Sequence, residues 1–412
     1  MKIIHTADLH LGQVLYQYYD RVDEHEHFFE QLNQWCHQYK PDALVVSGDV
    51  YDIPQPGAAS KEFFNRTFVK IHKENPDMTI VVTAGNHDSP SRIQADSSVW
   101  GLSGVTLIGV PPATDCMESP DGWQDRYIVD TGKGFIIAMP FVSSNRPDVL
   151  QALLDRVAVL NEGKNLPVVM TGHLAVNGGD FTGHGNIGTL KTTPSSDLGN
   201  GFDYLALGHI HRPQTIGYDI NDEMQQESLY PSGIMRYSGS ALHVSCDETY
   251  PHSVSLVEMK SHGGDVKVTR LRIDELRHFY ILPESTQPPI RSAEEATEVI
   301  NDFCQKHKSG YFRLRLDYNS PLPNDFIQNI YKITEATGNE IRYNPKPIEE
   351  NRPEEVHDTA APVFEVAELQ QMTDPLNFIR KTISNYPGLD INQIESDFAE
   401  IEKYLYKKES ES

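Results

Sequence analysis

Acid, amide and imidazole side chains recur in this sequence directly after short apolar runs. The candidate metal ligands are Asp8, His10, Asp49, Asn86, His173, His209 and His211. Each apolar run predicts a buried strand, so these side chains would gather where strands end. They offer oxygen and nitrogen ligands and no thiolate, which suits manganese, iron or a similar six-coordinate divalent ion better than a structural zinc. One such motif would mean little, but five in one chain predict a metal centre.

Two pairs of these residues are spaced two apart, Asp8 with His10 and His209 with His211. In extended backbone, alternate side chains share a face, so we expect each pair to point into one cavity. The residue between the two partners would then pack away from the cavity.

Asp49 and the segment from Asn86 to Asp88 suggest what the centre does. Asp49 is well placed to bridge two ions, and two bridged cations can bind a phosphate ester and activate a water for attack on phosphorus. His87 lies beside a predicted ligand and is free to protonate the leaving oxygen. The alternative for His87 and Asp88 is a local hydrogen-bonded turn. No Gly-x-Ser-x-Gly motif or reactive-cysteine arrangement competes with this hydrolysis.

Helices must alternate with the strands to bring these motifs together. Apolar spacing predicts helices over 23–39 and 58–74, with a strand at 43–47 between them. We interpret the aromatic stripe of the second helix as core packing in preference to an exposed dimer surface. The first helix contains His25, His27 and His37, which we interpret as solvent-facing or packing residues and not as ligands. The glycine-rich segment 178–188 lacks the Gly-Lys-Ser/Thr of a phosphate-binding loop. It is either a substrate-contacting loop or an ordinary connection.

The composition changes after the last predicted strand of the first part. We expect a metal-binding domain over 1–272 and a small α/β domain over 273–345, whose helices and strands follow a Pro-rich stretch at 283–291. A linker rich in Pro, Glu and Asn would follow over 346–363. The segment 364–412 contains two predicted helices with apolar stripes, which bind either a partner or the body of the protein.

Composition limits the function classes. The net charge of -24 argues against tight non-specific DNA binding by this chain alone, although not against phosphodiester chemistry at a metal centre. The tail from residue 346 contributes 15 acidic and 7 basic residues to it. Four scattered cysteines indicate a reduced, cytoplasmic setting. No apolar run approaches the ~20 residues of a membrane span, and no leader segment is expected.

Taken together, the motifs resemble a known family. Asp8-x-His10, Gly48-Asp49, Gly85-Asn86-His87-Asp88, Gly172-His173 and Gly208-His209-x-His211 are similar to the signature of the calcineurin-like metallophosphoesterases. The segments 5–12, 48–52 and 237–240 resemble its nuclease branch. The resemblance implies a four-layer α-β-β-α sandwich, which the apolar pattern alone does not distinguish from other layered α/β folds. It also implies a small DNA-binding capping domain and C-terminal helices that bind an SbcC-type ATPase.

The same resemblance implies roles for individual residues. The first metal would be held by Asp8, His10, Asp49 and His211, and the second by Asp49, Asn86, His173 and His209. Manganese is the usual activator in this branch, and His87 matches the catalytic histidine. Asp52 and Asp88 are candidates for supporting positions around the ligands, since some relatives have a substrate-side histidine where Asp52 stands.

The implied activity is metal-dependent DNA cleavage, as a 3′–5′ double-strand exonuclease and single-strand endonuclease. It would serve DNA end and hairpin processing, repair and recombination, in a homodimer within a heterotetramer with the ATPase. The helix at 58–74 is a candidate dimer element. Two alternatives remain: hydrolysis of a phosphodiester other than DNA, and a non-catalytic scaffold that tethers an ATPase to DNA. A protein phosphatase fits less well, because Asp52 is followed by Ile53-Pro54 and His87 by Asp88.

Overall fold

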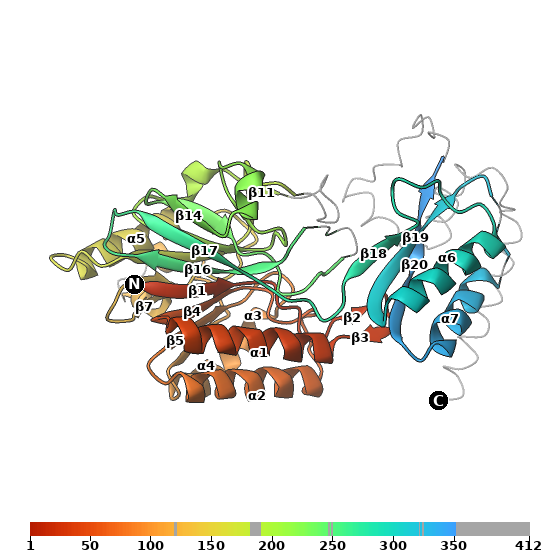
Figure 1. The fold of residues 1–412 in the computed structure, drawn as a ribbon. Coiled ribbons are helices and arrows are strands. Elements are labelled where there is room, and N and C mark those ends of the chain that lie inside the picture. The colour runs from red at the N-terminus through yellow and green to blue at the C-terminus, as the bar shows by residue number, and fades with distance from the viewer. Residues whose placement is uncertain are drawn as a thin grey trace, which may run out of the picture. The chain divides into compact units, whose positions relative to one another are not determined.

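The computed structural model describes residues 1–118, 122–181, 191–245, 248, 250–320, 322, 323 and 325–351. Most of its strands belong to two mixed sheets (Figure 1). The first sheet runs in the order β14-β17-β16-β1-β4-β5-β6, and the second in the order β13-β15-β12-β9-β8-β7. In chain order the bounds for the first sheet are β1 Lys2–Thr6, β4 Ala43–Ser47, β5 Thr79–Thr83, β6 Val105–Ile108, β14 Glu227–Tyr230, β16 Ser253–Met259 and β17 Val266–Arg272. Those for the second are β7 Ile128–Asp130, β8 Phe135–Ile137, β9 Val168–His173, β12 Tyr204–Gly208, β13 Gln214–Thr215 and β15 Ile234–Tyr237.

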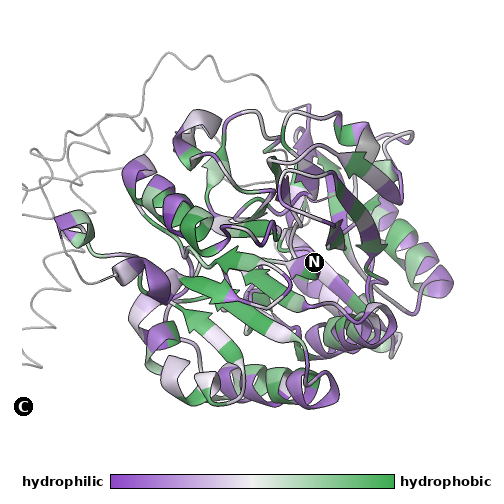
Figure 2. Ribbon diagram, turned by 90° about the vertical axis from the view of Figure 1, so that its left-hand side faces the viewer, coloured by the Kyte–Doolittle hydropathy of each residue, from purple (hydrophilic) through white to green (hydrophobic). Residues whose placement is uncertain are grey.

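Helices cover the outer face of each sheet. The first sheet packs against α1 Val22–Tyr39, α2 Ala58–Glu74, α3 Pro90–Ala95 and α4 Ser97–Gly101, and the second packs against α5 Pro147–Leu160. Alternate residues of β1 pack in two different hydrophobic cores. Ile4 lies in the core between the first sheet and its helices, and Ile3 lies in the core between the two sheets. Strands buried on both faces are accordingly mostly apolar, whereas the helices carry hydrophilic outer surfaces (Figure 2). This is the predicted four-layer α-β-β-α sandwich.

The two predicted N-terminal helices are confirmed. The aromatic stripe of α2 is buried, with Phe63, Phe64 and Phe68 all packed in the core between the helices and the first sheet. Full burial of one such side chain stabilises a fold by about 1.5–3 kcal/mol. The packing interpretation of this stripe is therefore confirmed, and its aromatic side chains are not available as a dimer surface.

A separate three-stranded parallel sheet contains β18 Phe279–Leu282, β19 Ser309–Asp317 and β20 Glu340–Glu350. Its helices are α6 Ala293–Lys306, which Ser292 caps by accepting from the Glu295 amide, and α7 Phe326–Ala336. One expectation needs correction, because β20 continues five residues into the segment predicted as a linker. After a register shift, residues 348–350 pair with the end of β19. The remaining linker, from residue 352, and the helices predicted in 364–412 lie outside the described residues.

Shorter elements complete the described chain: β2 Val14–Leu15, β3 Tyr19–Asp20, β10 Ala175–Val176, β11 Thr192–Thr193 and the 3-10 turns Cys116–Glu118, Trp123–Tyr127, Ser195–Leu198 and Ile220–Met224. Among the residues described, no helix combines the length and the apolar character needed to cross a bilayer. Cys36, Cys116 and Cys304 are buried free thiols, as expected.

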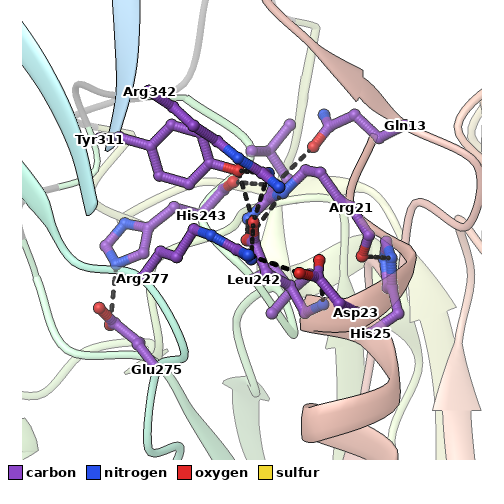
Figure 3. Close-up of polar contacts among 12 residues, drawn as sticks. Gln13, Arg21, Asp23, His25, Leu242, His243, Glu275, Arg277, Tyr311 and Arg342 are labelled. Carbon is purple, nitrogen blue, oxygen red and sulfur yellow. Dashed lines mark hydrogen bonds and ion pairs between the residues drawn. The ribbon is translucent and has the colours of Figure 1, made fainter. Parts of the chain in front are cut away.

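Glu24 of α1 joins the first helix to the small parallel sheet and to the segment that leads into it. The side chains of Arg21, Arg277, Tyr311 and Arg342 point toward one another at this junction (Figure 3). Its Oε1 accepts from Arg277 Nη1 at 3.3 Å, from Arg342 Nη1 at 3.2 Å and from the Tyr311 hydroxyl. Its Oε2 accepts from Arg21 Nη2 at 2.6 Å. Because the carboxylate is buried among three guanidinium groups, removing it would leave uncompensated positive charge.

Two buried histidines make the fold sensitive to acid. Burial, followed by the charge of Arg21, lowers the pKa of His25 to about 4, and burial with the charge of Arg236 lowers that of His5 to about 3. Unfolding restores both pKa values to about 6.5. Between pH 6.5 and 4 the unfolded chain therefore binds more protons than the folded chain, and the free energy of unfolding decreases as the pH is lowered. We expect a loss approaching about 2.7 kcal/mol per pH unit from this pair.

Denaturant unfolding in EDTA at pH 7.0, 6.0 and 5.0 measures this loss. His25→Gln, which keeps a hydrogen-bonding side chain without the titration, should reduce the dependence by about 1.4 kcal/mol per pH unit, while His5 still contributes, as does His252, whose pKa burial lowers to about 4. An unchanged slope in this variant would contradict the assignment.

Candidate metal centre

All five predicted motifs follow strands of the two sheets. The ends of β1, β4 and β5 supply Asp8, Asp49 and the segment from Asn86, while β9 and β12 lead to His173 and His209. β1, β4 and β5 are parallel neighbours, as are β9 and β12, so each set delivers its side chains at one edge. The two edges meet, and the candidate site lies between the sheets.

The backbone at the two pairs, Asp8 with His10 and His209 with His211, differs from the expectation. We predicted extended chain there, but Asp8, His10 and His209 have φ of 53°, 46° and 91°, and Asp49 has a φ of 49°. The strands end before these residues, and the loops pair with each other, since the Asp8 amide donates to the Gly48 carbonyl at 3.0 Å. The intervening Leu9 is still buried, as predicted. Left-handed backbone at four non-glycine residues is locally unfavourable and is typical of functional sites.

Glycines allow the loops to approach the imidazoles. A Cβ added at Gly48 would lie 2.1 Å from His173 Nδ1, and one at Gly208 would lie 2.0 Å from the Ser47 carbonyl oxygen. The glycines that precede Asp49 and His209 are therefore required by close packing across the site.

One half of the site is built around Asn86. Its Oδ1 lies 3.0 Å from His173 Nε2 and 2.8 Å from His209 Nδ1. His173 Nδ1 donates to the Ser47 carbonyl at 2.8 Å, which turns Nε2 toward the centre. Asp49 Oδ2 lies 3.3 Å from the same Nε2. Four predicted ligands thus converge here.

The other half contains Asp8, His10 and His211, whose ligand atoms lie within 4.8 Å of one another. Asp49 Oδ2 lies 3.9 Å from His10 Nε2, so this carboxylate stands between the two halves. Among the described residues neither buried ring nitrogen of His10 makes a hydrogen bond, although each faces a carboxylate, Nε2 that of Asp49 and Nδ1 that of Asp52. Buried nitrogens of this kind beside carboxylates are typical of metal ligands, so the residues fit a divalent cation.

The electrostatics show a site prepared for positive charge. Burial alone would raise the pKa of Asp49, but the neighbouring His173, His10 and His87 hold it well below its usual range. Burial would lower the pKa of His173, yet the charge and hydrogen bond of Asp49 raise it to about 9. Burial raises the pKa of Asp8. In the metal-free chain, protons therefore occupy positions that a cation would take, and cation binding would release them.

His87 is exposed at the rim of the site. Its amide donates to Asp49 Oδ1 at 2.8 Å, and its Nδ1 lies 2.8 Å from the Asp52 carbonyl oxygen. A carbonyl only accepts, so Nδ1 carries a hydrogen and Nε2 remains for a substrate. His87, His10 and Asp52 also form a group with ligand atoms within 4.8 Å.

Asp52 and Asp88, the two residues predicted to support the ligands, contact the loops that follow β1, β4 and β5. Asp52 Oδ1 lies 3.2 Å from His10 Nδ1. Asp88 accepts from the amides of Gly85, Val50 and Tyr51 at 2.8–3.0 Å, which ties the loop after β5 to the loop after β4. The turn considered for Asp88 is thus present, and it spans two loops. Burial raises the pKa of Asp88 to about 6.

Sequence reasoning missed Glu248, which lies far from any strand-end motif. Its Oε1 lies 2.8 Å from His211 Nδ1, and its Oε2 accepts from the Val244 amide at 3.0 Å. Burial alone would lower the pKa of His211, but the charge and hydrogen bond of Glu248 raise it to about 9. A carboxylate behind an imidazole fixes its tautomer and strengthens it as a ligand. No local spacing in the sequence signals this contact.

Replacing Glu248 with glutamine should weaken manganese binding by about 10- to 100-fold. The amide keeps the shape but not the charge that orients His211. Calorimetric titration at pH 9 is the appropriate measurement, because His211, whose pKa is raised to about 9, is about half deprotonated there and protons compete with manganese only about two-fold. Glu275→Gln is the matched control, since Glu275 pairs with His243 and touches no predicted ligand. Equal affinities in the two variants would contradict a role for Glu248.

Several known proteins are similar to this chain. A family profile described as calcineurin-like phosphoesterase matches residues 1–213, more than half of the chain. The SbcD component of the SbcCD nuclease of Escherichia coli (strain K12) is 29% identical over 303 residues, covering 68% of this chain and 70% of that protein. The Staphylococcus saprophyticus protein of the same name is 28% identical over 359 residues, covering 82% and 85%.

The Bacillus subtilis (strain 168) protein of that name is 29% identical over 283 residues, covering 63% and 66%. Among solved structures, a dimetal phosphatase from Danio rerio covers 65% of this chain and 98% of its own, at 12% identity and a TM-score of 0.32, which is a slight likeness.

The calcineurin-like phosphoesterase profile, which matches residues 1–213, contains all five strand-end motifs. The chain belongs to the calcineurin-like phosphoesterase family.

Proposed function

We propose that this protein is a metal-dependent DNA nuclease that hydrolyses phosphodiesters at two divalent cations, with manganese as the activator. The observation that carries the proposal is the position of Asp49 Oδ2, 3.3 Å from His173 Nε2 in one half of the site and 3.9 Å from His10 Nε2 in the other. Relatives named as components of the SbcCD nuclease support DNA as the substrate.

The proposed ligands divide between the two halves. Asp8, His10, Asp49 and His211 would hold one cation, and Asp49, Asn86, His173 and His209 would hold the other. Two such cations would supply an activated water at neutral pH and would stabilise the charge that develops on the phosphate.

The chain's own contribution is proton transfer and orientation. His87 would donate a proton from Nε2 to the departing oxygen, while its Nδ1 hydrogen bond to the Asp52 carbonyl fixes the ring. Its exposed position leaves room for a nucleic-acid strand to approach. The proposed activities are 3′–5′ exonuclease on duplex ends and endonuclease on single strands.

We further propose that an SbcC-type ATPase works with this chain in DNA end and hairpin processing, in a heterotetramer that contains two copies of each. The net charge of -24 supports division of labour, because the partner would then supply most of the positive surface for DNA. The segment 273–345 would act as a DNA-binding cap, and 364–412 would bind the ATPase. DNA binding by this chain alone should be weak and salt-sensitive, and much tighter with the partner.

The test is cleavage of end-labelled duplex and single-stranded DNA by the purified chain with manganese, with and without the ATPase. Hydrolysis of bis-p-nitrophenyl phosphate reports on the metal centre in parallel. Cleavage of both substrates supports the proposal. If the small ester is hydrolysed while DNA survives even with the ATPase, the substrate is a different phosphodiester. If neither is hydrolysed although manganese binds, a non-catalytic tethering role remains.

A further inference from the structure

A cavity of about 440 Å³ opens beside the metal centre. Three proposed ligands, Asn86, His173 and His209, form part of its wall, so the cavity and the metal site are continuous. Its volume lies in the range of small-molecule sites, about 300 to 1,000 Å³. None of the steps proposed above uses it.

The walls of the cavity are mainly apolar. Phe141, Val142 and Leu174 are half-buried around it, and Leu150, Met170 and Leu205 are buried. Phe141 is the aromatic member, and its ring lies edge-on to the His173 ring, with centroids 6.3 Å apart. An apolar chamber with an accessible ring beside a phosphate site matches a flat heterocycle better than a charged group.

The wall segment is held in place by hydrogen bonds. The Phe141 amide donates to the Ala84 carbonyl at 2.8 Å, two residues before Asn86. Arg146 Nη1 donates to the carbonyls of Pro112 and Ala113 at 2.7 and 2.9 Å. The ring is therefore positioned on a fixed loop next to a proposed ligand.

Charge around the cavity also favours a nucleic acid. None of the described residues that line it is acidic, although the chain as a whole carries a net charge of -24. Two of the described lining residues are cationic, Arg146 and the exposed Lys191. By contrast, the cavity near the small parallel sheet has a net acidic lining of four glutamates and two arginines: Glu248, Glu275, Glu284, Glu350, Arg313 and Arg315. A polyanion would approach the first cavity with less repulsion than the second.

We propose that this cavity binds one nucleobase of the cleaved strand, stacked on Phe141, while the adjoining phosphate lies at the metal centre. The inference rests on the proposed nuclease function and deepens it. Only an unpaired base can enter, so the cavity selects single-stranded or frayed ends. Apolar walls and a stacking ring tolerate all four bases, so cleavage would depend on the presence of a base and little on its identity.

Oligonucleotides with a single tetrahydrofuran abasic residue, placed in turn at each position around the cleavage site, test the pocket. For the wild-type chain with manganese, we expect kcat/KM to fall about 10- to 100-fold when the missing base is the one that enters the cavity. Val142→Trp, which fills the cavity, and Phe141→Ala, which removes the ring, should cleave the intact strand more slowly by a similar factor. Both variants should then cleave intact and abasic strands at nearly equal rates.

The ratio of intact to abasic cleavage is internal to each protein, so partial misfolding does not change it. Val159→Trp on the exposed face of α5 is the matched control and should keep the wild-type ratio. Phe141→Tyr, which retains a ring, should restore most of it. Equal cleavage of intact and abasic strands by the wild-type chain would overturn the pocket and leave the nuclease proposal standing. Cleavage of neither strand, with the ATPase present, would overturn both.

Discussion

Replacing Asp49 with asparagine should abolish DNA cleavage, with kcat reduced at least about 1,000-fold. Loss of the carboxylate that stands between the two halves of the site removes several kcal/mol of charge stabilisation, and about 4 kcal/mol corresponds to that factor. The fold should survive, because asparagine tolerates the left-handed backbone at this position, where φ is 49°. Its amide oxygen can also still accept from the His87 amide.

Calorimetric titration with manganese separates this effect from misfolding. We expect Asp49→Asn to weaken manganese binding strongly and to remain folded in EDTA, with a lower melting temperature because buried His173 loses the carboxylate that stabilises its protonated form. Asp77→Asn, at an exposed position before β5, is the control and should match the wild type in both measurements. Unimpaired manganese binding by Asp49→Asn would refute the bridging role.

His87→Ala should lower kcat on DNA by about 100- to 10,000-fold, the usual contribution of a general acid. Because His87 is exposed and stands at the rim, its removal should leave manganese affinity and stability unchanged. The effect should depend on the leaving group. A p-nitrophenolate departs without protonation, so hydrolysis of bis-p-nitrophenyl phosphate should fall far less than DNA cleavage.

His37→Ala, an exposed histidine of α1 that pairs with Glu74, is the control. If His87→Ala loses the same factor on both substrates, His87 acts in some way other than proton donation. Reduced manganese affinity would instead place His87 among the ligands, as its grouping with His10 and Asp52 allows.

The sequence was sufficient to predict which residues gather, because strand-end placement is a local property. A buried apolar run predicts a strand, and the residue after it lies at the sheet edge whatever the topology. The backbone at these residues was predicted incorrectly, since extended chain was expected where Asp8 and His209 are left-handed. That conformation arises from hydrogen bonds between loops distant in sequence, such as the Asp8 amide with the Gly48 carbonyl.

Contacts across long separations explain the other omissions. Glu248 reaches His211 from 37 residues away, and Phe141 meets His173 through an unrelated loop. Neither pair has a spacing that a linear pattern could show. The end of β20 was missed for a similar reason, because its last residues look like a linker until they pair with β19.

The first strand has a consequence for synthesis on the ribosome. β1 lies between β4, which follows it closely in the sequence, and β16, which begins only at Ser253. At roughly 5–20 residues per second, the emerging chain waits on the order of tens of seconds before β16 can pair with β1. During that interval one edge of an apolar strand is open to other chains. We therefore expect translation speed and chaperone access to change the yield of folded protein while leaving the stability of the folded protein unchanged.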